Sequence, residues 1–383
     1  MNLKKLVLRA EAKFMKTSML LFFAPGRVNL IGEHLDYNGG LVLPCAIDLG
    51  IYGVVAPRDD ALVRCFSENV PFLGVIEFSL SQLMYEKKHG WANYVKGMLK
   101  ETKATCGFDL YVRGNLPNGA GLSSSAALEI LVGTIVNRLE NRQMSATAIA
   151  LCGQKAENNF IGVQCGIMDQ FVIAHAQEGH AMLLDTSNLS FSLVEANFLD
   201  YCLVIGNTNK RRALSDSKYN ERRSECEQGL RDLNTVLDIP YLCALKAADL
   251  DKYAYLIDNP VVFKRVRHVV TENERVKKAF EALKLRNLQE FGKLLNASHL
   301  SLKHDYQVTG LELDTLVALH QAYGAIGARM TGAGFGGCMI ALMPKAHLNE
   351  VLREISQEYQ QITHLVPDFY LVTAGKGANQ YGY

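Results

Sequence analysis

The sequence predicts an α+β fold of two domains, and three observations point to it. The 383-residue chain is long enough for more than one hydrophobic core. From residue 20 to about 185, β-branched runs mix with helical periods, which indicates a mixed sheet with helices. Helical spacing then dominates from 211 to about 300, and strands return after 336. We expect a first domain over residues 1–185 and a second over residues 186–383, with the boundary near 185–200.

Local patterns justify the elements of the first domain. The β-branched run "AIDLGIYGVVA" (46–56) predicts a strand, and "AALEILVGTIVNRL" (126–139) has the apolar spacing of a buried helix. The apolar stretch "HAMLLDTSN" (180–188) predicts a short strand followed by a turn. These elements give the first half its mixed character.

The second domain begins with a strand, "DYCLVIGNT" (200–208). Three helical segments follow, and they cover 211–233, 261–283 and 287–300. The segments "GCMIALMP" (337–344) and "FYLVTA" (369–374) predict strands on either side of a helix over 346–359.

Composition and charge exclude several classes of protein. With 40 Lys plus Arg against 39 Asp plus Glu, no overall field attracts nucleic acid or an anionic membrane. The nine cysteines are odd in number, scattered and without a C-x-x-C pair, unlike a disulfide framework or a zinc site. We find no signal-peptide cleavage pattern and no apolar run of 18 residues, so we expect a cytoplasmic protein.

The stretch "FFAPGRVNLIGEHLDYNGG" (22–40) is an unusual strand and turn. It opens apolar and then places Arg27, Glu33, His34 and Asp36 among several glycines. So many polar groups of both signs within one turn indicate a binding site.

A second glycine-rich segment, "LPNGAGLSSSAALEILVGTIVNRL" (116–139), leads into a helix. Ser123 to Ser125 offer capping hydroxyls, and the helix start at Ala126 is strong. A glycine-rich loop at a helix N-terminus exposes backbone N–H groups and the positive end of the helix dipole, which suit phosphate oxygens. The alternative is a structural capped turn.

The more common nucleotide motifs are absent from the sequence. There is no P-loop G-x-x-x-x-G-K-[ST] and no H-R-D or D-F-G of a protein kinase. The run "GAGFGG" (332–337) precedes a predicted strand, whereas a dinucleotide fingerprint opens a helix.

Two carboxylates complete the candidate chemistry. A phosphate-bound magnesium ion is held by one or two protein oxygens, which a serine hydroxyl and Glu157 can supply, although Glu157 alone also fits a solvated helix. Phosphoryl transfer to an alcohol needs a carboxylate for the hydroxyl proton and a cation for the transferring group. Asp169 and Arg27 are the candidates, and Asp169 alone also fits a helix cap.

Taken together, the motifs of this chain resemble those of the GHMP kinases. The first of them, residues 26–40, resembles the signature of the galactokinase family. The matching segments are "GRVNLIGEHLDYNGG" (26–40), "PNGAGLSSSAALE" (117–129) and "TGAGFGGC" (331–338), and "AEN…CGIMDQ" and "KYNERRSEC" are also similar. The resemblance runs from about residue 22 to the C-terminus. It implies a two-domain GHMP kinase fold, an N-terminal domain like ribosomal protein S5 domain 2, and a site between the domains.

The resemblance also implies ATP, Mg²⁺ and galactose as ligands, with phosphate transferred to the sugar C1 hydroxyl. It implies Asp169 as catalytic base or hydroxyl-orienting carboxylate and Arg27 as transition-state stabiliser, and Ser125 and Glu157 as Mg²⁺ ligands. The implied sugar-binding residues are Glu33, His34, Leu35, Asp36 and Tyr219. Those implied for ATP are Ser67, Gly119, Ala120, Gly121, Leu122, Ser123, Ser124 and Ser125.

Two positions depart from the usual family pattern "GEHTDYNDG", because this chain has Leu35 for threonine and Gly39 for aspartate. Leu35 removes a hydroxyl from between two binding residues, so affinity or sugar range is expected to change slightly. A related sugar kinase for N-acetylgalactosamine or L-arabinose remains an alternative, as does a non-catalytic sugar and ATP sensor. For the oligomeric state we expect a monomer or a weak dimer.

Overall fold

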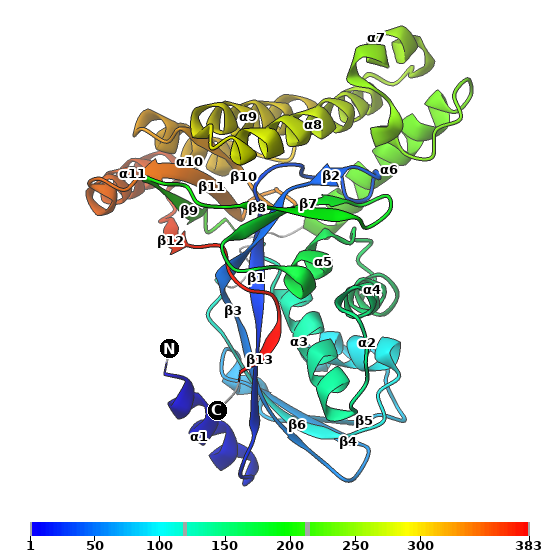
Figure 1. Ribbon diagram of the computed structural model, residues 1–383, viewed down its shortest axis with the longest axis vertical. Coiled ribbons are helices and arrows are strands. Elements are labelled where there is room, and N and C mark those ends of the chain that lie inside the picture. Colours follow the sequence, from blue (N-terminus) through cyan, green and yellow to red (C-terminus); the bar gives the residue numbers. More distant parts are fainter. Residues whose placement is uncertain (1, 118–120, 211–214, 382–383) are drawn as a thin grey trace.

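The computed structural model describes residues 2–117, 121–210 and 215–381, and they form an α+β molecule of three sheets with helices (Figure 1). The largest sheet has six strands in the order β13-β1-β3-β6-β4-β5. Its only parallel pair in the described chain is β4 with β6, so the predicted mixed sheet is confirmed. The strands are β1 (Leu20–Asn29), β3 (Pro44–Pro57), β4 (Leu62–Ser67), β5 (Ile76–Ser79), β6 (Phe108–Gly114) and β13 (Asn379–Tyr381).

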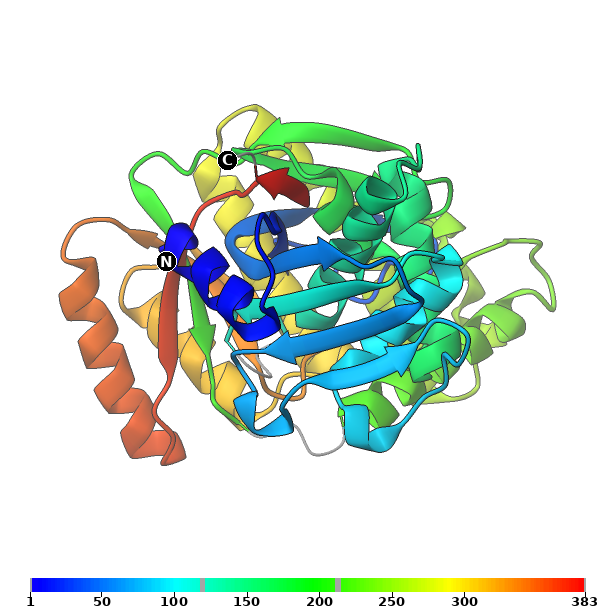
Figure 2. The same ribbon diagram turned by 90° about the horizontal axis from the view of Figure 1, so that it is seen from below.

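Helices cover both faces of this sheet, as Figure 2 shows from below. On one face, Leu6, Ala10 and Phe14 of α1 pack against a small second core that includes Phe66 and Tyr111. On the other face, the apolar α3 packs on β1 and β3, and α2, α4 and α5 surround it. The helices are α1 (Leu3–Phe14), α2 (Ala92–Thr102), α3 (Ser124–Leu139), α4 (Ala146–Lys155) and α5 (Met168–His175).

The predicted boundary at 185 falls in the turn of a hairpin, because β7 pairs with β8 in a three-stranded sheet. The third strand of this sheet is β2, which belongs to the loop after β1. In addition, the C-terminal strand β13 returns to pair with β1 in the large sheet. The strands of the small sheet are β2 (Leu41–Val42), β7 (His180–Asp185) and β8 (Phe191–Glu195).

The second half of the chain builds an antiparallel sheet in the order β10-β11-β9-β12 and a layer of helices over it. Its strands are β9 (Tyr201–Asn207), β10 (Gly327–Met330), β11 (Cys338–Pro344) and β12 (Asp368–Val372). Its helices are α6 (Ser215–Leu233), α7 (Leu250–Tyr253), α8 (Pro260–Lys284), α9 (Leu288–Ser301), α10 (Leu311–Ala322) and α11 (Leu348–Thr363). The strands and helices expected there are present, with residues 211–214 of the first expected helix lying outside the described residues.

One hydrophobic core runs through both halves, since residues from β1, α3, α8 and β11 belong to the same buried cluster. The loop after β1, which carries the polar turn, is therefore fixed between the two halves. Among the described residues, none of the helices combines the length and the apolar character that a membrane span needs.

Candidate active site

A cleft of about 630 Å³ lies beside the loop after β1, and both halves of the chain contribute to its walls. The start of α3, the segment before α5 and the glycine loop between β10 and β11 form the other walls. Most of the residues selected from the sequence meet there, namely Arg27, Glu33, His34, Asp36, Gly121, Ser123, Ser124, Ser125, Glu157, Asp169 and Tyr219.

A β-bulge directs Arg27 into this cleft. The register between β1 and β3 shifts between Pro25 and Arg27, which leaves Gly26 at the irregularity. A Cβ on Gly26 would lie 2.5 Å from the Leu116 side chain and 2.9 Å from the Leu122 carbonyl oxygen, so only glycine fits. The glycine next to the predicted arginine therefore permits close contact with the serine loop.

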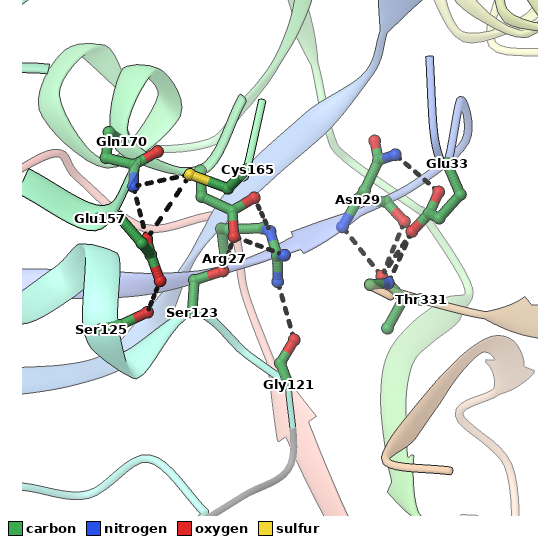
Figure 3. A network of polar contacts seen from close by, with 12 residues as sticks. Arg27, Asn29, Glu33, Gly121, Ser123, Ser125, Glu157, Cys165, Gln170 and Thr331 are labelled. Atoms are coloured by element: carbon green, nitrogen blue, oxygen red, sulfur yellow. Dashed lines mark hydrogen bonds and ion pairs between the residues drawn. The ribbon is translucent and has the colours of Figure 1, made fainter. Parts of the chain in front are cut away.

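Arg27 and Asp169 form a bidentate ion pair inside the cleft. Arg27 Nε donates to Asp169 Oδ1 and Nη2 to Oδ2, each at 2.8 Å. Arg27 Nη1 donates to the Gly121 carbonyl at 2.9 Å (Figure 3). Ser123 Oγ donates to Oδ2 as a third partner. Bidentate charge-assisted bonds fix both groups in direction as well as in distance. The helix-cap alternative for Asp169 is excluded, because Ile167 is the N-cap of α5 and Asp169 lies within the first turn.

The serine loop departs from the prediction in one respect. Helix α3 begins at Ser124, and Ser123 adopts the left-handed conformation (φ 61°) without capping the helix through its side chain. The hydroxyls bind carboxylates instead: Ser123 donates to Asp169, and Ser125 Oγ donates to Glu157 Oε1 at 3.1 Å. The prediction of capping hydroxyls was wrong for Ser123, because a capping residue normally has an extended backbone and Ser123 is left-handed. The N-terminus of α3 remains open toward the cleft.

Glu157 lies in a π-helical turn (Ala156–Ile161) after α4, a distortion that is frequent at functional sites. Burial and the nearby Asp169 raise its pKa to about 7. The buried Gln170 donates from Nε2 to Glu157 at 2.9 Å and also to Glu129 at 3.0 Å. Burial and the charge of Glu157 raise the pKa of Glu129 well above its usual value.

The oxygen donors of this wall fit a magnesium ion. The described residues contain no cluster of three or more histidine, cysteine, aspartate or glutamate side chains suited to a metal. A magnesium ion that is bound with phosphates needs only one or two protein oxygens, and Ser125 and Glu157 provide a hydroxyl and a carboxylate 3.1 Å apart. These two protein oxygens are sufficient for a Mg²⁺ site in which phosphate oxygens supply further ligands.

Asp36 lines the cleft close to Asp169 and to the backbone of Gly166. Burial, and then the charge of Asp169, raise the pKa of Asp36 to about 7. A Cβ on Gly166 would lie 1.9 Å from Asp36 Oδ2, so a glycine is required beside this carboxylate. Sequence reasoning missed Gly166, since nothing in the segment "VQCGIMD" signals that contact.

Glu33 lines the cleft, but both of its oxygens are bound by protein groups. Oε2 forms an ion pair with the fully buried Arg329 (Nη2, 2.6 Å) and accepts from Asn29 Nδ2 at 2.6 Å. Oε1 accepts from the backbone N–H of Gly332 at 2.7 Å and from Thr331 Oγ1 at 3.2 Å (Figure 3). Glu33 thus ties the polar turn to the third glycine motif, and sequence reasoning missed Arg329 as its partner.

His34 has a left-handed backbone conformation (φ 65°), which is uncommon for a residue other than glycine. Its Nδ1 lies 2.8 Å from the Tyr37 hydroxyl, and its ring centroid is 5.6 Å from that of Tyr219. Burial lowers the pKa of His34 to about 3, so the imidazole is neutral.

Several predicted residues do not line the cleft. Leu35 and Leu122 are buried in the hydrophobic core, because their apolar side chains are excluded from water there. For Leu35 this corrects the expected contact with the sugar, because the side chain is fully buried and does not line the cleft. Ser67 is buried at the end of β4, where its Oγ accepts from the Asn69 N–H at 3.2 Å. Gly119 and Ala120 lie outside the described residues.

The second half of the chain adds three cleft residues that were not predicted, Asn207, Asn209 and Lys210, whereas Ala333 belongs to the predicted third motif. The polar run "NTNK" directly after the predicted strand 200–208 was the available signal for the first three.

Comparison with protein families gives three matches along the chain. The galactokinase galactose-binding signature matches residues 11–57, the GHMP kinases N terminal domain matches 93–177, and the GHMP kinases C terminal model matches 279–361.

Individual relatives are similar over nearly the whole chain. A galactokinase of Enterococcus faecalis is 50% identical over 365 residues, covering 94% of each chain, and one of Staphylococcus saprophyticus is 49% identical over 361 residues, covering 93% of this chain and 94% of the relative. The crystal structure of Lactococcus lactis galactokinase complexed with galactose superimposes with a TM-score of 0.96 at 44% identity, covering all of both chains. Methanococcus jannaschii mevalonate kinase, at 20% identity and a TM-score of 0.64 over 94% of this chain and 99% of that one, shares the fold.

Proposed function

The chain belongs to the galactokinase family of the GHMP kinases, and from this premise we propose how its cleft phosphorylates galactose. The reaction moves the γ-phosphate of ATP to the C1 hydroxyl of the sugar and yields galactose 1-phosphate and ADP. The observation that carries the proposal is the Arg27–Asp169 pair, which lies in one cleft with the polar turn and the start of α3.

Asp169 receives or orients the proton of the attacking hydroxyl, and Arg27 stabilises the charge on the transferring phosphoryl group. Phosphoryl transfer depends on this positioning and electrostatic stabilisation more than on covalent chemistry by the protein. A carboxylate offers about four lone-pair positions. Arg27 and Ser123 occupy three of those on Asp169, so one remains for a sugar hydroxyl.

The ATP phosphates bind at the segment Gly119 to Ser125, because the backbone N–H groups at the N-terminus of the following helix α3 favour anions. Ser125 and Glu157 hold Mg²⁺, which neutralises phosphate charge when bound. Gln170 keeps the Glu157 carboxylate directed at Ser125. Ser67 is included only because its position matches the family, since its hydroxyl does not line the cleft.

Asp36, His34 and Tyr219 bind the sugar hydroxyls, since all three line the cleft near Asp169. Glu33 contributes chiefly by holding the polar turn against Thr331 and Gly332. We also propose the division into residues 1–185 and 186–383, with β13 added to the first unit. A cytoplasmic location agrees with nine cysteines that are all free thiols.

The decisive experiment measures ADP release over a panel of sugars with and without Mg²⁺. We expect galactose to give the highest kcat/KM and chelation of Mg²⁺ to abolish turnover. A higher kcat/KM on N-acetylgalactosamine or L-arabinose would overturn the assignment of galactose as the substrate. Binding of ATP and galactose without any sugar phosphate would indicate a sensor.

A further inference from the structure

A chain of hydrogen bonds leads from the cleft into the C-terminal helices through side chains that the reaction itself does not use. It begins at His34 Nδ1, which lies 2.8 Å from the Tyr37 hydroxyl. That hydroxyl lies 2.8 Å from the Tyr306 hydroxyl, which lies 3.1 Å from Cys226 Sγ. Tyr306 and Cys226 are buried and come from the π-helical turn after α9 and from α6.

The same residues hold His34 in its left-handed backbone conformation. Asn38 Nδ2 donates to the His34 carbonyl at 2.8 Å, and the Asn38 side chain also reaches the Cys226 thiol. The rings of His34 and Tyr306 pack with their centroids 4.6 Å apart. An uncommon backbone conformation at a binding site persists only where its surroundings enforce it.

The second ring nitrogen of His34 faces a different environment. Nε2 is buried and has no hydrogen-bond partner in the described part of the chain. His34 itself lines the cleft. Nε2 is therefore the ring atom left for a ligand oxygen.

We propose that the Tyr37–Tyr306–Cys226 chain positions His34 and keeps its proton on Nε2, so that His34 donates a hydrogen bond to one hydroxyl oxygen of the sugar. The inference rests on the proposed function, because it requires a sugar in this cleft. Tyr37, Tyr306 and Cys226 are positioning residues that act through His34.

The proposed direction of the chain gives each of its groups one hydrogen bond to donate. In a neutral imidazole one nitrogen donates and the other accepts. If Nδ1 donated to Tyr37, Nε2 would be the acceptor of the ring and could only receive a hydrogen bond from the sugar. If Nδ1 accepts, Tyr37 donates to it, Tyr306 donates to Tyr37, and the Cys226 S–H donates to Tyr306. Each group then donates once, and Nε2–H is free to donate into the cleft.

The first test observes the tautomer directly by nitrogen NMR of protein labelled with ¹⁵N-histidine. The ten histidines require a His34→Gln sample to identify the His34 signals. We expect a proton on Nε2 in the unchanged protein and a mixture of tautomers in Tyr37→Phe. A proton on Nδ1 of the unchanged protein would overturn the inference, and this readout does not depend on kinase activity.

The second test measures steady-state kinetics. We expect Tyr37→Phe to raise KM for galactose about 3- to 10-fold, as loss of one neutral hydrogen bond implies, with kcat within about twofold. Tyr306→Phe should act in the same direction, and Cys226→Ser, which keeps a donor, should retain the normal KM. Tyr52→Phe is the matched control, since Tyr52 packs on Phe23 in the N-terminal sheet. An unchanged KM for galactose in Tyr37→Phe would show that the Tyr37–Tyr306–Cys226 hydrogen bonds do not position His34.

The two tests separate this inference from the proposed function. Absence of galactose phosphorylation by the unchanged protein would reject the function, while the NMR result would still report the tautomer. Urea unfolding of each variant identifies any loss of fold, and Cys226→Ser offers a second comparison if Tyr306→Phe folds poorly.

Discussion

Arg27 and Asp169 are 142 positions apart in the sequence, and two hydrogen bonds of 2.8 Å join their side chains in the cleft. Arg27 is almost fully buried, whereas the Asp169 side chain is 29% exposed, so the carboxylate faces the open side of the pair. A planar guanidinium matches a carboxylate in this way and a lysine does not. The pair therefore sets the direction from which a sugar hydroxyl approaches Asp169.

Replacing Asp169 by asparagine tests the catalytic assignment. We expect Asp169→Asn to bind galactose but to lose about 10²- to 10⁴-fold in kcat, because a positioned base contributes that much. ADP release gives kcat, and calorimetric titration gives galactose affinity. Asp60→Asn is the control, since Asp60 pairs with Arg58 at the surface. A nearly normal kcat in Asp169→Asn would remove Asp169 from the mechanism.

The sequence predicted the fold class and the strands and helices of the second half because apolar periodicity is a local property. It also selected Arg27 and Asp169 as the cation and the carboxylate of phosphoryl transfer, but no local pattern indicated that the two side chains are in contact. The Glu33–Arg329 pair connects residues 296 positions apart, and no local pattern announces such a contact. The prediction placed Leu35 among the sugar-binding residues because it lies inside the matched motif. Motif matching gives the place of a residue in the sequence, whereas the burial of the Leu35 side chain follows from packing.

Replacing Gly166 by alanine tests the geometry around Asp36. The new Cβ would lie 1.9 Å from Asp36 Oδ2 and 2.2 Å from Cγ, so the carboxylate must move. We expect KM for galactose to rise at least about tenfold, as loss of a hydrogen bond to a charged group implies, with KM for ATP unchanged. Gly114→Ala is the control, because its nearest neighbouring atom is 3.6 Å away. Equal KM values for the two variants would contradict the role of Asp36.

The pH dependence of activity tests the ionisation of Asp36. Burial raises its pKa to about 7, so the group is mostly protonated below that pH in the free enzyme. A carboxylate accepts sugar hydroxyls better than a carboxylic acid does. We therefore expect kcat/KM for galactose to rise about tenfold per pH unit below 7 and to level off above it, since this ratio reports groups of the free enzyme. Asp36→Asn should have a lower kcat/KM that no longer rises with pH below 7. If the rise persisted in this variant, the titrating group would not be Asp36.

Replacing Glu33 by glutamine tests its structural role. Arg329 is fully buried, so loss of the Glu33 charge leaves a cation in the interior with its ion pair broken. Breaking a buried pair in this way costs about 3 to 5 kcal/mol, and we expect Glu33→Gln to lower the free energy of unfolding in urea by that amount. Glu195→Gln is the matched control, because the Glu195–Arg286 pair is exposed and contributes about 0 to 1 kcal/mol. If both variants unfolded at the same urea concentration, Glu33 would not anchor the polar turn to the third glycine motif.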